Sequence, residues 1–150
     1  MKSTSTVSLL CGLVLTIIAT TNVASAPPPP LPNPVLYPTG QEFLQVGGKQ
    51  FTQYNYDVLN KSSYPADLFA PAPELPPCGA NTKASRTWVD FYDQRGKRIY
   101  GFCALATPND LGKIFFRLEI DVIPPSYVYI ELTDRQTNTK YKSNLAETTQ

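Results

Sequence analysis

Short runs of alternating apolar and polar residues, each followed closely by a turn signal, constrain the fold of this 150-residue chain most strongly. The clearest case is "RTWVDFYDQRGKRIYGFCAL", residues 86–105, where two such runs flank Asp93-Gln94-Arg95-Gly96-Lys97. This five-residue sequence fits a type I turn followed by a left-handed glycine. A period of two residues is typical of β-strands, and the chain has no stretch of useful length with a helical period. The sequence therefore predicts an all-β fold.

The same pattern recurs along the chain. Gly47-Gly48 is a two-residue hairpin signal, and the strand after it carries Thr52, Tyr54, Tyr56 and Val58 at alternate positions. Residues 113–123 predict another strand, preceded by a turn at 108–112 with Asn109 or Asp110 as its cap. Residues 126–144 predict a final hairpin with Asn138 in a left-handed conformation. Its inward side chains are Val128, Ile130 and Leu132, and its outward side chains are Tyr127, Tyr129 and Glu131.

These runs make about seven strands with closely spaced turns, which predicts a small antiparallel β-sandwich. From about Gln41 to Asn144 the chain resembles the broad class of immunoglobulin and fibronectin type III domains. The resemblance rests on strand number and hairpin style, so it assigns no functional residue.

Both ends of the chain differ from this region. Residues 1–26 combine Lys2, the apolar run "VSLLCGLVLTIIA" and the small residues "ASA", which predicts a secretory signal peptide rather than a membrane anchor. Residues 27–40 are proline-rich and predict an extended arm or linker, with a ligand for an aromatic groove as the alternative. We expect a folded domain over 41–144 and a disordered tail over 145–150. The protein is then secreted and extracellular, or periplasmic or in the cell envelope in a bacterium.

Cysteine and histidine contents limit the chemistry. Beyond the leader the chain has two cysteines, Cys78 and Cys103, which an oxidising compartment would join in a disulfide; two buried thiols are the alternative. The sequence has no histidine, which excludes Ser-His-Asp and Cys-His catalysis and imidazole metal sites. We therefore predict no cofactor, no metal and no recognisable catalytic motif.

The charge balance bears on partners. Lys2 is the only charged residue of 1–26, so the rest of the chain has one basic residue fewer than the 13 of the whole sequence and balances its 12 acidic residues. A neutral chain gives no electrostatic reason to bind nucleic acid or anionic membranes after signal cleavage. It also supplies little repulsion between copies, so weak self-association is expected.

A long proline-containing loop occupies residues 60–85. Asn60-Lys61-Ser62 is an N-glycosylation sequon, which a eukaryotic host would be able to modify, and it is expected to be exposed. Tyr64, Leu68 and Phe69 are expected to pack this loop onto the sandwich.

The hairpin at 86–105 carries the candidate ligand-binding residues Trp88, Tyr100, Phe102, Asp90 and Arg98. The expected register places Phe91 opposite Ile99 and Val89 opposite Gly101 on one face, and Trp88 opposite Phe102 on the other. In the structural interpretation Trp88 and Phe102 point into the core, and the proline-rich loop covers the opposite face. In the functional interpretation the aromatic rings are exposed and stack on sugar rings, with Asp90 and Arg98 bonding to hydroxyl groups.

Three functions follow from these alternatives. The first is a secreted, non-catalytic domain with a structural, adhesion or protein-interaction role. The second is a carbohydrate-binding module that uses the aromatic face. The third is a small hydrolase that uses two carboxylates in one cleft, but most candidates lie beside turns or at outward strand positions. Those candidates are Asp90, Asp93, Asp110, Glu119, Asp121, Glu131 and Asp134.

Overall fold

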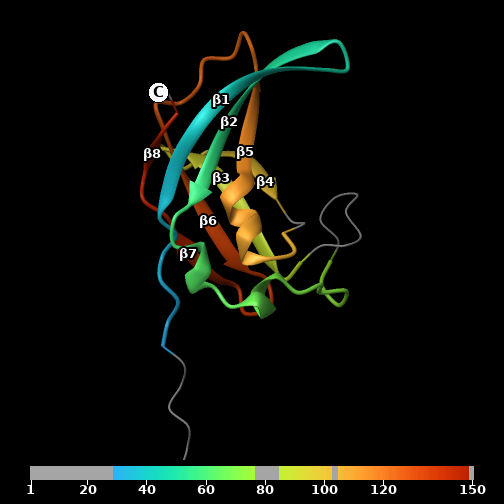
Figure 1. Cartoon of the computed structure of the whole chain (residues 1–150), viewed down its shortest axis with the longest axis vertical. Coiled ribbons are helices and arrows are strands. Elements are labelled where there is room, and N and C mark those ends of the chain that lie inside the picture. Colours follow the sequence, from blue (N-terminus) through green and yellow to red (C-terminus); the bar gives the residue numbers. More distant parts are fainter. Residues whose placement is uncertain (1–28, 77–84, 103–104, 149–150) are drawn as a thin grey trace, which may run out of the picture.

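The computed structural model describes residues 29–76, 85–102 and 105–148. They form an all-β domain with two antiparallel sheets (Figure 1). The first sheet has the order β1-β2-β5, with strands β1 (Leu36–Val46), β2 (Lys49–Val58) and β5 (Ile114–Glu119). The second has the order β4-β3-β6-β7, with β8 also paired to β6. Its strands are β3 (Thr87–Asp93), β4 (Arg98–Phe102), β6 (Tyr127–Asp134), β7 (Thr139–Lys142) and β8 (Ala146–Glu147).

The predicted inward faces of β2 and β6 are confirmed, whereas β3 turns Val89 and Phe91, rather than Trp88, toward the core. Tyr54, Tyr56 and Val58 of β2 and Val128, Ile130 and Leu132 of β6 are buried in one core with Val89 and Phe91 of β3. The ring of Tyr56 lies 5.4 Å from that of Phe91, so the two sheets meet through aromatic side chains. Aromatic rings bury large apolar areas and dominate a core of this size.

Two predicted turns are confirmed by their backbone conformation. Gly47 and Gly48 join β1 to β2 with φ of +58° and +79°, the left-handed values that a two-residue turn needs at both positions. Asn138 joins β6 to β7 with φ of +58°. The structure has eight strands in the described residues, rather than about seven.

The described parts of the connections contain three short 3-10 helices: η1 (Lys61–Ser63), η2 (Ala66–Phe69) and η3 (Pro108–Lys113). As expected, Tyr64, Leu68 and Phe69 pack the long loop onto the core, each with at most 4% of its surface exposed. At η3 the cap is Thr107, which forms a capping box with Asp110.

The folded region is longer at both ends than the sequence predicts. β1 begins at Leu36 inside the expected arm, with Pro38 next to a register shift in an edge strand, where proline is tolerated. The described part of the arm before β1 is docked: Pro34 is buried, and the Tyr64 hydroxyl donates to the Pro32 carbonyl at 2.7 Å. At the other end, the expected disordered tail contains β8, which pairs with the start of β6.

Candidate functional site

The expected ligand-binding set is divided between two faces of the second sheet. Val89 and Phe91 point into the core, so Trp88 and Asp90 lie on the outer face. Arg98 joins them there, because its Nε donates to Asp90 Oδ1 at 2.7 Å. Tyr100 and Phe102 instead pack against the core. The structure thus brings together Trp88, Asp90 and Arg98 only.

A β-bulge in the hairpin causes this division. Asp93 N donates to Lys97 O at 2.9 Å, so the turn closes as predicted. The register then shifts, and Phe91 lies opposite Tyr100. The predicted pairing of Phe91 with Ile99 is therefore wrong, as is the placement of Trp88 and Phe102 on one face. A bulge moves every later side chain on its strand to the other face, and nothing in the sequence marks its position.

Tyr100 and Phe102 instead border the first sheet. Their rings lie 6.0 and 5.1 Å from the ring of Phe115 on β5. Phe102 also contacts the core ring of Phe91 at 6.4 Å. These two aromatics link the edges of the sheets and do not extend a platform from Trp88.

The outer face of the second sheet is aromatic and charged. The rings of Tyr92 and Tyr129 stack at 5.2 Å, and the Lys142 ammonium lies 4.0 Å above the Tyr129 ring. Lys140 pairs with Glu131 at 2.6 Å on the same face. Most of these side chains thus already have a stacking, cation–π or ion-pair partner within the fold.

A hollow of about 490 Å³ lies beside Trp88 on this face. Trp88 Nε1 is buried without a hydrogen-bond partner among the described residues. The guanidinium of Arg135 lies 5.2 Å from the Trp88 ring and covers one side of it. The lining residues are Leu75, Pro76, Trp88, Asp90, Thr133, Arg135, Asn138 and Lys140. We refer to this hollow as the Trp88 cleft.

A second hollow, of about 560 Å³, lies at the end of the domain where the β3–β4 turn approaches the β5–β6 connection. Its apolar lining combines one residue from β4, one from β5 and four from the connection: Ile99, Leu118, Val122, Ile123, Pro124 and Pro125. Its polar lining comes from the β3–β4 turn and its flanks, Asp93, Gln94, Arg95, Lys97 and Arg98, and from Ser126 of the β5–β6 connection. We refer to it as the loop-end groove. Its volume is in the range of ligand-binding clefts.

The charge at the loop-end groove is positive. Asp93 Oδ1 accepts the backbone amides of Arg95 and Lys97 at 2.9 and 2.8 Å, which fixes this carboxylate inside the turn. Arg98 is paired with Asp90. Within the described ranges, the exposed side chains of Arg95 and Lys97 have no ion-pair partner. Two cations are therefore available to an anionic group in the groove.

The apolar wall of the groove is unusually exposed and yet held in place. Ile123 has 90% of its surface exposed and Val122 has 47%. The two prolines that follow limit the backbone conformations of this wall. The Thr148 hydroxyl donates to the Pro125 carbonyl, and Thr148 N donates to Ser126 O at 3.2 Å. An exposed apolar surface with a fixed shape is typical of a binding site.

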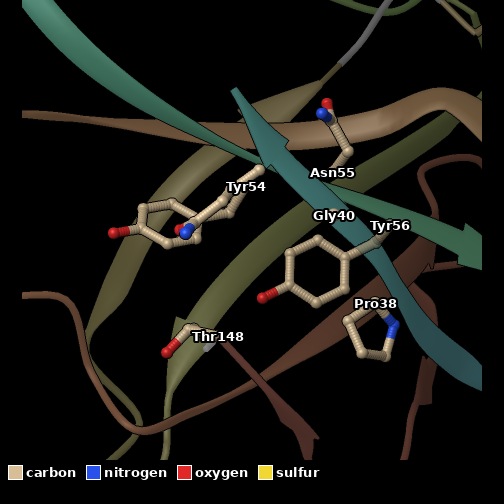
Figure 2. Close-up of a pocket in the computed structure, with 7 residues that line it drawn as sticks. Pro38, Gly40, Tyr54, Asn55, Tyr56 and Thr148 are labelled. Atoms are coloured by element: carbon tan, nitrogen blue, oxygen red, sulfur yellow. The ribbon is translucent and has the colours of Figure 1, made fainter. Parts of the chain in front are cut away.

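A smaller cavity lies under the irregular part of β1. It has a volume of about 20 Å³, and Figure 2 shows Tyr54, Tyr56 and Thr148 around it beside Gly40. This volume suits one water molecule rather than a ligand.

Six of the seven candidate carboxylates have structural partners. Asp93 and Asp134 accept hydrogen bonds within their turns, and Asp110 accepts the Thr107 amide in the capping box of η3. The other three form ion pairs: Asp90 with Arg98, Glu119 with Lys49, and Glu131 with Lys140. Among the residues that the structure describes, no cluster of three or more carboxylate or thiol groups is placed to bind a metal ion.

The remaining predicted sites have different outcomes. Asn60 is half-buried, and its side chain binds the arm: Nδ2 donates to Asn33 O at 2.9 Å and Oδ1 accepts Val35 N at 2.8 Å. This amide therefore has a structural role in addition to its place in a sequon. Cys78, Cys103 and the predicted signal peptide lie outside the described residues, so their predictions stay open.

Comparison with known proteins gives no match to a family model, a curated protein or a solved structure. In the described ranges, no helix has the length and apolar character that crossing a membrane requires. A functional assignment must therefore rest on the two hollows and the surfaces around them.

Proposed function

We propose that this protein is a secreted, non-catalytic β-sandwich domain that binds a protein partner in its loop-end groove. The order of the strands supports an immunoglobulin or fibronectin type III type of sandwich. When β1 to β7 are named A, B, C, C′, E, F and G, the sheets become A-B-E and C′-C-F-G. This is the immunoglobulin arrangement with strand C′ and without strand D.

The loop-end groove carries the protein-interaction role. It combines an exposed apolar wall at Val122–Ile123 with Arg95 and Lys97, two cations that have no ion-pair partner among the residues that the structure describes. An apolar segment with acidic side chains complements both features, because its apolar groups cover the wall and its carboxylates approach the cations. Interface cores are apolar and their rims are charged, which is the same distribution.

A peptide-binding experiment tests this function. Fluorescein-labelled peptides that alternate Leu or Phe with Glu are titrated with the mature chain, and fluorescence anisotropy is recorded. Matched peptides carry Lys in place of Glu. We expect the acidic peptides to bind more tightly, with an affinity that falls as salt increases.

Substitutions assign the binding to the groove. Ile123→Ser and Lys97→Glu should each weaken binding about tenfold, which corresponds to about 1.4 kcal/mol. Leu59→Ser and Lys113→Glu are the matched controls, because both residues are exposed and lie outside the groove lining. The proposal is rejected by an absence of binding, by equal binding of acidic and basic peptides, or by groove variants that bind like the wild type.

The Trp88 cleft supports a second candidate function, glycan binding. The observation in its favour is the Trp88 Nε1 group, buried and unpartnered among the described residues beside Asp90 and Thr133. Displacement of the Arg135 guanidinium would free a ring face for a sugar. Because Trp88 is the only tryptophan, its fluorescence reports directly on the cleft. A change of emission on titration with a soluble polysaccharide, enhanced in Arg135→Ala, would support this function, and unchanged emission in both proteins would reject it.

A further inference from the structure

The strand β1 forms an outer edge of the first sheet. It pairs with β2 on one side only, and no other described strand lies beside it in the sheet. Figure 1 shows the β1–β2 hairpin extending beyond the other strands. Such an edge presents unpaired backbone donors and acceptors, which can template pairing with another strand.

The first half of this edge is closed within the molecule. The Asn144 side chain bonds to both backbone groups of Leu36: Oδ1 accepts Leu36 N at 2.8 Å, and Nδ2 donates to Leu36 O at 3.0 Å. Pro38 has no backbone donor, and the register shift between Pro38 and Gly40 breaks the regular strand. An incoming strand therefore cannot continue along residues 36–40.

The second half of the edge, Gln41–Val46, is open and regular. Val46 pairs with Lys49 next to the two-residue turn, and this closing pair is hydrogen-bonded in such hairpins. Bonding then alternates along the strand, so the backbone groups of Gln41, Phe43 and Gln45 point away from β2. Phe43 has 71% of its surface exposed in this segment. The fold thus protects one half of the edge and leaves the other half able to pair.

We propose that a second copy of this chain pairs its own β1 with this open half, antiparallel and centred on Phe43. In that register Phe43 lies opposite Phe43 of the second copy, and Gln41 lies opposite Gln45. Cross-strand aromatic pairs stabilise sheets, and three such pairs of residues exchange about six backbone hydrogen bonds. The three-stranded sheet becomes a continuous six-stranded sheet in the dimer.

The sequence of the segment favours this register over its neighbours. Glu42 lies opposite Leu44 of the second copy, so no like charges meet. A register centred on Glu42 would place two carboxylates opposite each other, which destabilises a sheet. A register centred on Leu44 would place Gln41 opposite Gly47, inside the turn, and would lose a bonded pair. The balanced charge of the chain beyond residue 26 adds no general repulsion.

Sedimentation velocity over a concentration series tests the dimer. A contact limited to one short strand is small, so we expect a weak, rapidly exchanging dimer whose population rises with concentration. Gln45→Pro removes a backbone donor that points outward, so it should abolish the dimer while leaving the β1–β2 ladder intact. Gln45→Ala is the matched control and should dimerise like the wild type. Equal thermal unfolding of both variants shows that the fold is retained.

Engineered cysteines test the register. Residues in a hydrogen-bonded pair have Cα atoms about 5.5 Å apart, which a disulfide can span. Phe43→Cys should form covalent dimers on mild oxidation in excess of the wild type. Gln41→Cys alone should not, whereas a mixture of Gln41→Cys and Gln45→Cys should. A wild-type chain that stays monomeric at every concentration overturns the proposal, as does a Gln45→Pro variant that still dimerises. Ile123→Ser should dimerise normally, which separates this result from that of the groove.

Discussion

At the scale of single residues, Asp134 is the most strongly constrained carboxylate in the described structure. Arg86 donates to both of its oxygens, from Nε at 2.7 Å and from Nη2 at 2.6 Å, and thereby joins the start of β3 to the end of β6. This hydrogen bonding lowers the pKa of Asp134 from 3.8 to about 2. The side chain is only 6% exposed, so solvent screens the pair weakly.

The Asp134 pair predicts a specific loss of stability in acid. Because the folded-state pKa is depressed, the stabilisation is complete above about pH 4 and is lost as the pH falls through about 2. It amounts to about 2 kcal/mol. Urea unfolding at a series of pH values should therefore show a steeper decline in the unfolding free energy for the wild type than for Asp134→Asn. Parallel curves for the two proteins would contradict this assignment.

At the scale of elements, the β1–β2 turn fixes the register in which the two strands of the hairpin pair. Gly48 has a φ of +79°, a conformation that costs a residue with a Cβ atom about 1 kcal/mol. Gly48→Val should therefore lower the unfolding free energy by about 1 kcal/mol or more and weaken the proposed β1 dimer. Gly47→Asn is the matched control, because asparagine tolerates the left-handed conformation. Urea unfolding and sedimentation measure the two effects, and equal stability of both variants would refute the argument.

The elements also show which features a sequence reveals. Strand faces follow from local alternation, and turns follow from glycine and asparagine at left-handed positions, so Tyr54, Ile130 and Asn138 were predictable. The bulge beside Phe91 was not, because it depends on how two strands twist together rather than on any residue type. The bulge also limits how much of the candidate site the sequence reveals. Trp88, Asp90 and Arg98 share one face, as the alternation predicts, but the bulge places Tyr100 and Phe102 on the other face.

At the scale of the whole molecule, the C-terminal segment connects parts that are distant in the sequence. Its two strand residues pair with β6, and the carbonyl of Glu147 accepts the hydroxyl of Tyr56 from the opposite sheet at 3.1 Å. Thr148 binds Pro125 and Ser126 at the loop-end groove. The sequence of this segment has no strand pattern. Tertiary hydrogen bonds rather than local preference hold the segment in place, so the strand is not visible in the sequence.

Removal of residues 145–150 should therefore affect stability and the loop-end groove together. Loss of these hydrogen bonds should lower the unfolding free energy by about 2 kcal/mol or more. Amide hydrogen exchange at Val122, whose N–H donates to Glu119 O at 2.9 Å, and at Tyr127, whose N–H donates to Gln94 Oε1 at 3.4 Å, should accelerate, because the wall of the groove loses its attachment to Thr148. Deletion of residues 149–150 alone is the control, because it keeps every hydrogen bond named above. A truncated chain that exchanges as slowly as the full chain at these amides would show that the groove is held by its prolines alone. Weaker binding of the acidic peptides to the truncated chain would show that peptide binding depends on the fixed shape of this wall.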